Sequence, residues 1–203
     1  MNAKIRAVLN HFQKTDPILF SIAKRVDIEQ IESRETEDYF HSLCHEIIGQ
    51  QLAKNAACAI FDRFKKLFAS ERITPEETIK LTEETIRNVG ASWSKARFIK
   101  DLAQEVVDGI LNLKDLTRLD DSQVVENLTK IKGIGPWTAQ MFLMFTLGRE
   151  DIFSHGDLGL KKAMVKLYSL NEDATQDEIE KITKKWSPYR TYACQMLWKY
   201  SDI

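Results

Sequence analysis

Apolar residues recur three and four positions apart along most of the chain, and this helical spacing constrains the fold more than any other feature. Runs that alternate apolar and polar residues, as β-strands do, are absent, and glycine and proline are scarce (8 and 4 in 203 residues). One stripe consists of Phe40, Leu43, Ile47 and Ile48 and ends at Gly49. The sequence therefore predicts an all-α fold.

Capping residues indicate where helices begin. Thr74-Pro75-Glu76-Glu77 and Thr175-x-x-Glu178 are typical helix starts, with a side-chain cap and a glutamate three residues later. Ser92 predicts the start of a longer helix that runs to about Asp108, and Asp121 or Ser122 is expected to cap the next one. Many short helices with short connections are therefore expected.

The segment Leu128 to Ala139 predicts a helix, a two-glycine hairpin and a second helix. Gly133 and Gly135 allow positive φ and close approach of another molecule, and Pro136 suits the first turn of the second helix. The unpaired N–H groups of that turn and the positive end of its dipole can bind a phosphate. A plain connection between two packed helices is the alternative, and a single G-x-G does not exclude it.

Charge and cysteine content exclude several classes of protein. No stretch reaches the roughly 20 apolar residues of a membrane span, and the N-terminus has no signal region, so a cytoplasmic protein is expected. The net charge is −1, with 11 Lys and Arg against 9 Asp and Glu after position 129, which is a weak basic bias. The three cysteines (Cys44, Cys58 and Cys194) form no C-x-x-C pair, so neither a disulfide framework nor a metal or iron–sulfur site is expected.

Two linked motifs carry a resemblance to a known family. The hairpin K-G-I-G-P-W-T-A resembles that of the HhH-GPD superfamily of DNA glycosylases. Asp157 follows 22 residues after Gly135, within Phe153-Ser154-His155-Gly156-Asp157, which looks like the glycine-aspartate segment that bears the catalytic carboxylate of that superfamily.

Further matches point to the 3-methyladenine DNA glycosylase II branch of the superfamily. These are Ile47 to Leu52 upstream and Lys185 to Ala193 with Leu197-Trp198 downstream, so that the resemblance spans about residues 40 to 200. Two departures stand out, because the family often has proline at Ser154 and the N-terminal β-rich domain of longer relatives has no room here.

The resemblance implies an HhH-GPD fold of two helical subdomains with a cleft between them. Residues 38–148 would form a central helical domain that carries the helix-hairpin-helix. Residues 1–37 together with 149–203 would form the second subdomain, which carries Asp157.

The resemblance also implies the chemistry. Asp157 would stabilise the positive charge that develops on the sugar as the N-glycosidic bond breaks, although an Asp before an apolar helix is also an ordinary N-cap. Bifunctional relatives have a Schiff-base lysine at the position of Trp137, so water is the expected nucleophile. Lys132 and Lys161 do not occupy that position.

Aromatic and polar residues complete the expected site. Trp137 and Trp198 match positions that line the base pocket of the resembled branch, whereas Trp186 is expected in the core. Gln51 is expected to fill the gap left by the flipped base, with Gln50 as the alternative. The phosphate-binding hairpin is expected to comprise Lys132, Gly133, Ile134, Gly135 and Thr138.

The resulting hypothesis is a monofunctional DNA glycosylase that removes alkylated purines, of the 3-methyladenine and 7-methylguanine class, in base excision repair. The expected partner is double-stranded DNA containing alkylated bases, and the protein is expected to be a monomer without a cofactor, apart from a non-catalytic monovalent cation allowed at the hairpin. A non-catalytic DNA-binding module and a glycosylase for another damaged base remain the alternatives. The sequence does not rank individual lesions.

Overall fold

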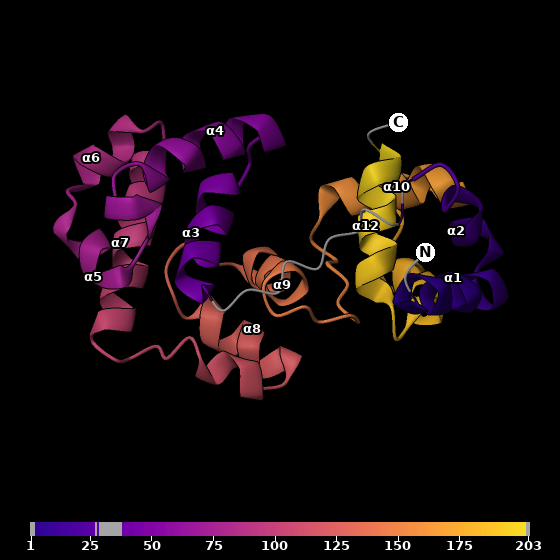
Figure 1. Ribbon diagram of the computed structural model, residues 1–203. Coiled ribbons are helices and arrows are strands. Elements are labelled where there is room, and N and C mark those ends of the chain that lie inside the picture. The colour runs from indigo at the N-terminus through magenta and orange to yellow at the C-terminus, as the bar shows by residue number, and fades with distance from the viewer. Residues whose placement is uncertain (1–2, 27, 29–37, 202–203) are drawn as a thin grey trace. The chain divides into compact units, whose positions relative to one another are not determined.

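The computed structural model describes residues 3–26, 28 and 38–201 of the chain (Figure 1). Within these ranges the regular structure is helical and contains no strand, so the prediction of an all-α fold is confirmed. The helices begin where the caps indicate. At the helix after residue 119, however, the cap is Asp120 rather than Asp121 or Ser122, because Asp120 and Gln123 form a reciprocal capping box.

The chain divides into two compact units. Unit 2 comprises residues 35–147, and unit 1 comprises residues 1–34 together with 148–203. Unit 1 is therefore built from both ends of the chain. Among the described residues, no helix is long and apolar enough to cross a bilayer.

Unit 2 is organised around α3 (Tyr39–Gly49), which packs against α4 (Lys54–Lys65), α7 (Trp93–Val107) and α9 (Pro136–Phe145). Two six-residue helices, α5 (Pro75–Lys80) and α6 (Glu83–Asn88), also pack against α7. Helix α9 packs against α8 (Asp121–Thr129), to which the hairpin connects it. Two short 3-10 helices, η2 (Ala69–Glu71) and η3 (Asp115–Arg118), also belong to this unit. Since α9 is apolar on nearly every side, it is buried in the centre of the unit.

In unit 1, α1 (Ala3–Thr15) and α2 (Pro17–Ile22) pack with three elements from the other end of the chain (Figure 1). These are α10 (Leu158–Tyr168), η4 (Lys184–Trp186) and α12 (Arg190–Ser201). Helix α11 (Gln176–Thr183), which starts with the expected capping box at Thr175, leads directly into η4.

A buried carboxylate joins the two segments of unit 1. Asp16 is 4% exposed and caps α2 by accepting a hydrogen bond from the Leu19 amide (3.0 Å). Its other oxygen accepts from the Tyr168 hydroxyl (2.7 Å) and from Nε1 of Trp186 (2.8 Å). Trp186 is fully buried, which confirms its expected place in the core. A buried carboxylate with three donors is satisfied, and it fixes the N-terminal helices to the rest of the unit.

Candidate functional site

The carboxylate of Asp157 is held from two directions. Asp157 is the N-cap of α10, and its Oδ1 accepts a hydrogen bond from the Leu160 amide (2.8 Å). The same oxygen accepts from Nε1 of Trp198 on α12 (3.2 Å). Both residues are half-buried. The expected cap and an indole contact that the sequence did not predict therefore both orient this carboxylate.

Two small residues shape the surroundings of Asp157. A Cβ on Gly159 would lie 3.1 Å from Oδ1 of Asp157 and 3.6 Å from Cδ1 of Trp198, so glycine leaves room for their hydrogen bond. Ser154 stands where the family often has proline and is fully buried, and its carbonyl accepts from the Asp157 amide (3.2 Å). The turn that leads into Asp157 is thus closed by a backbone hydrogen bond.

The position of Trp198 depends on how α12 begins. Asp151 accepts from Nε (2.8 Å) and Nη2 (3.1 Å) of Arg190, and also from the hydroxyl of Ser187 (2.7 Å). Burial acts to raise the pKa of Asp151, but these hydrogen bonds outweigh it and lower the pKa below its usual value. This bidentate pair anchors the first turn of the helix that carries Trp198.

The hairpin between α8 and α9 uses its two glycines differently. Gly133 has φ +86°, and a Cβ there would overlap the ring of Phe98 on α7. Gly135 is the N-cap of α9 with φ −93° and ψ 175°, and no atom lies within 4 Å of where its Cβ would be. Positive φ is therefore used only at Gly133, whereas Gly135 leaves open space at the start of α9.

Burial separates the hairpin residues into two groups. Lys132 and Gly135 are exposed, and Pro136 takes the first position of α9. Ile134 and Thr138 are 3% and 2% exposed. Any contribution from these two residues to phosphate binding therefore has to come from their backbone.

The two glutamines at the end of α3 have different surroundings. Gln50 is half-buried, and its Nε2 donates to the Gly133 carbonyl (2.8 Å) and to Oγ1 of Thr138 (3.0 Å). Gln51 is exposed and has φ +57°. Of the two, Gln51 has the side chain that is available to enter a duplex.

The two tryptophans expected in the base pocket belong to different units. Trp137 lies in the first turn of α9 in unit 2, and Trp198 lies on α12 in unit 1. Each is half-buried. Met141, which takes the place of a pocket tyrosine in the resembled branch, is buried in the core.

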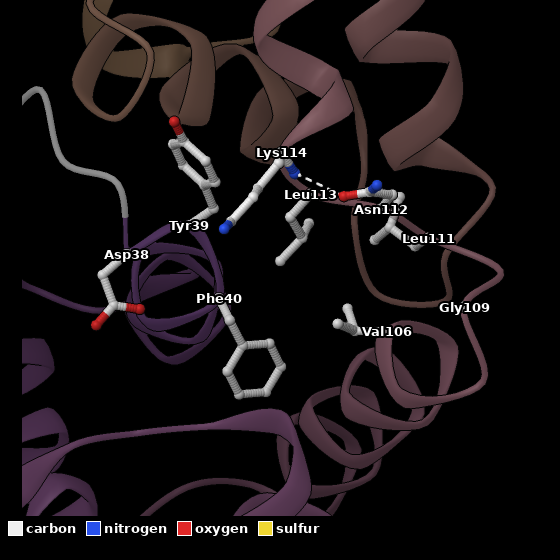
Figure 2. Close-up of a pocket in the computed structure, with 9 residues that line it drawn as sticks. All are labelled: Asp38, Tyr39, Phe40, Val106, Gly109, Leu111, Asn112, Leu113 and Lys114. Carbon is white, nitrogen blue, oxygen red and sulfur yellow. Dashed lines mark hydrogen bonds between the residues drawn. The ribbon is translucent and has the colours of Figure 1, made fainter.

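A pocket of about 380 Å³ lies elsewhere in unit 2, between the start of α3 and the segment after α7 (Figure 2). Phe40, Val106 and Leu113 provide apolar walls, and Asp38 and Lys114 lie at its edge. Its lining contains none of the residues that the motifs identify. In the described part of the chain, no cluster of three or more His, Cys, Asp or Glu side chains could hold a metal ion.

Comparison with known proteins assigns the chain to a family. Residues 44–188 match the HhH-GPD superfamily of base excision DNA repair proteins. The chain belongs to this superfamily. The matched region contains both the hairpin and Asp157, so the two motifs lie within one family domain, as the resemblance implied.

Individual HhH-GPD proteins are similar over most of the chain. DNA-3-methyladenine glycosylase 1 of Schizosaccharomyces pombe is 34% identical over 84% of this chain and 76% of its own length. The structure of the 3-methyladenine DNA glycosylase Mag1 of that yeast in complex with abasic DNA superposes with a TM-score of 0.88, at 30% identity and 97% coverage of both chains. A DNA-3-methyladenine glycosidase structure from Bacillus halodurans gives 0.76 at 34% identity, covering 94% of this chain and 87% of the other.

Sequence reasoning missed residues that support the HhH-GPD motifs from a distance. Nζ of Lys95 on α7 donates to the carbonyls of Ile48 (2.9 Å) and Gln50 (2.7 Å), and the ring of Phe98 fills the space beside Gly133. The sequence contained one signal for Lys95. The dipole of a helix disfavours a lysine in its first turn, so another interaction is expected to stabilise the lysine there.

Proposed function

We propose that this chain is a monofunctional DNA glycosylase of base excision repair, which flips an alkylated purine out of duplex DNA and hydrolyses its N-glycosidic bond. The observation that carries the proposal is the Asp157 carboxylate, oriented by the Leu160 amide and the Trp198 indole. The names of the relatives support 3-methyladenine as the class of lesion, and the Mag1 complex with abasic DNA supports DNA as the partner.

The proposed reaction requires an anion beside the sugar. As the N-glycosidic bond breaks, its electron pair leaves with the base and positive charge develops on the sugar, which Asp157 stabilises. Water then adds to the anomeric carbon and loses a proton to solvent, which gives an abasic site. Trp137 offers no amine at the position of the Schiff-base lysine, which supports water as the nucleophile.

The remaining residues would bind and flip the substrate. The first turn of α9 with Lys132, Gly133 and Gly135 would hold a phosphate without reading the sequence. The exposed Gln51 would fill the gap in the stack. The faces of Trp137 and Trp198 would attract a cationic alkylated base, by about 1 to 2 kcal/mol once desolvated.

The proposal also includes a monomeric enzyme and a monovalent cation bound at the hairpin. The carbonyls of Ile131 and Gly133 would be the oxygen donors for the cation. They already accept hydrogen bonds from the Ile134 amide (3.1 Å) and from Gln50 (2.8 Å), and each oxygen keeps a second lone pair for an ion. Such an ion would support the hairpin and take no part in the chemistry.

Release of bases from methylated duplex DNA tests the proposal. The wild-type protein should release 3-methyladenine and 7-methylguanine, and strand breaks should form only after alkaline treatment of the product. Asp157→Asn keeps an oxygen that can accept from Leu160 and removes the charge, so it should bind DNA but excise about 100- to 1,000-fold more slowly.

Each other outcome has a definite meaning. Binding without base release by the wild type would favour a non-catalytic DNA-binding module. Strand breaks without alkali would contradict the monofunctional mechanism. Full activity of Asp157→Asn would remove Asp157 from the catalytic role.

A further inference from the structure

The turn between α3 and α4 contains a backbone conformation that its sequence does not favour. The Leu52 amide donates to the Gly49 carbonyl (3.1 Å), with Gln50 at φ −49°, ψ 128° and Gln51 at φ +57°. These values describe a type II β-turn, whose third position is normally glycine or asparagine. Glutamine is strained there, and such strain persists only where the surrounding structure holds it.

Lys95 holds this turn from the neighbouring helix. Its ammonium donates to the carbonyls of Ile48 (2.9 Å) and Gln50 (2.7 Å), which lie at the C-terminal end of α3. These carbonyls lie beyond the internal hydrogen bonds of the helix and carry the negative end of its dipole, which a cation complements. Burial lowers the pKa of Lys95, so the contact is made by a partly desolvated group.

The side chain of Gln50 connects the same turn to the hairpin. Its Nε2 bonds the Gly133 carbonyl and Oγ1 of Thr138 while its backbone carbonyl receives Lys95. Gln50 thus links helix α7, the strained turn and the phosphate-binding hairpin. The side chain of Gln51 lies outside this network and is exposed.

We propose, on the basis of the proposed function, that Lys95 is a positioning residue for base flipping: by binding the Ile48 and Gln50 carbonyls it holds the strained turn that presents Gln51 to the duplex. Gln50, through its hydrogen bonds to Gly133 and Thr138, fixes the position of this turn relative to the hairpin. Lys95 acts through Gln51 and does not touch the reacting atoms.

The same helix supplies a matched control. Lys100 also lies on α7, is also partly buried, and donates to two backbone carbonyls at the end of α5, those of Ile79 (2.8 Å) and Leu81. Lys95→Met and Lys100→Met therefore remove the same kind of contact from the same helix. Only the first change affects the turn that carries Gln51.

Insertion can be measured without the chemical step. A duplex carries a tetrahydrofuran abasic analogue opposite 2-aminopurine, whose fluorescence rises when it is unstacked, and each variant of the full chain is added to saturation. Wild type, Lys95→Arg and Lys100→Met should raise the fluorescence equally. All three keep a cationic side chain at position 95 that can donate to the carbonyls of Ile48 and Gln50. Lys95→Met and Gln51→Ala should lose most of the signal, and combining them should lose no more than Gln51→Ala alone.

Excision provides a second readout. Single-turnover release of 7-methylguanine opposite cytosine, at saturating enzyme, should fall about 10- to 100-fold in Lys95→Met, because the flipped geometry is no longer preorganised. In Lys100→Met it should change little, although both variants should lose similar thermal stability.

The failure of this inference can be told apart from failure of the proposed function. If the wild type inserts and Lys95→Met inserts equally well, or loses no more than Lys100→Met, the role of Lys95 is refuted while the glycosylase proposal stands. If the wild type gives no fluorescence change on bound DNA, Gln51 does not insert and the inference falls with it. If the wild type inserts but releases no base, the glycosylase proposal fails and the fluorescence comparison still decides the role of Lys95.

Discussion

The indole of Trp198 combines a polar contact with an aromatic face, and two substitutions separate them. Trp198→Phe keeps an aromatic face and removes the N–H that reaches Oδ1 of Asp157. We expect this change to slow single-turnover excision about 10-fold for every lesion, which is the effect of losing one hydrogen bond to a charged group. The measurement compares cationic 7-methylguanine with neutral hypoxanthine at one salt concentration.

Trp198→Leu removes the aromatic face as well. If the base stacks on this ring, the further loss relative to Trp198→Phe should be larger for 7-methylguanine than for hypoxanthine, because only the cationic base gains from the electron-rich face. An equal further loss for both lesions, together with a lowered melting temperature, would instead place the ring in the packing of α12.

At the level of secondary-structure elements, the helix-hairpin-helix predicts opposite outcomes for its two glycines. Gly133→Ala has to adopt φ +86° and displace the Phe98 ring, so it should lower the free energy of unfolding by about 2 to 4 kcal/mol. Gly135→Ala meets no atom and has φ −93°, so its stability should stay within about 0.5 kcal/mol of wild type. Thermal or chemical denaturation of both variants checks this.

Gly135→Ala should keep its stability but bind DNA more weakly than the wild type. The methyl group of Gly135→Ala would occupy the open space at the start of α9, so we expect weaker binding to damaged and undamaged duplexes by the same factor. Unchanged affinity would mean that DNA does not approach α9 at this point. A loss confined to damaged DNA would mean that the hairpin reads the lesion rather than a phosphate.

The parts of this architecture that could be predicted from sequence are local in the chain. The start of α10 at Asp157 and the hairpin between α8 and α9 depend on residues a few positions apart, which caps and glycines specify directly. The contact of Gln50 with Gly133 joins positions 83 residues apart, and the contact of Lys95 with Gln50 spans 45. Helical periodicity shows that two faces are buried but not which polar side chains meet between them.

At the scale of the whole molecule, unit 1 is discontinuous in sequence and depends on contacts between the two ends of the chain. Asp16 provides one of these contacts, since it binds Tyr168 of α10 and Trp186 of η4 in the interior. Asp16→Ala would take this partner from the partly buried Tyr168 hydroxyl and the fully buried Trp186 indole N–H, and would remove the cap of α2. The expected loss is about 3 to 5 kcal/mol of unfolding free energy.

Thr175→Ala is the matched control for this prediction, because it removes an exposed helix cap from the same unit and should cost about 1 kcal/mol. Hydrogen exchange followed by mass spectrometry locates the effect. In Asp16→Ala, residues 3–26 and 148–201 should lose protection together and to the same extent, because Asp16 links the two segments of one cooperative unit, while unit 2 keeps its protection. Loss of protection in α1 and α2 alone would show that these helices are an appendage to an independently stable C-terminal segment. Equal loss in both units would show that the chain unfolds as a single cooperative structure.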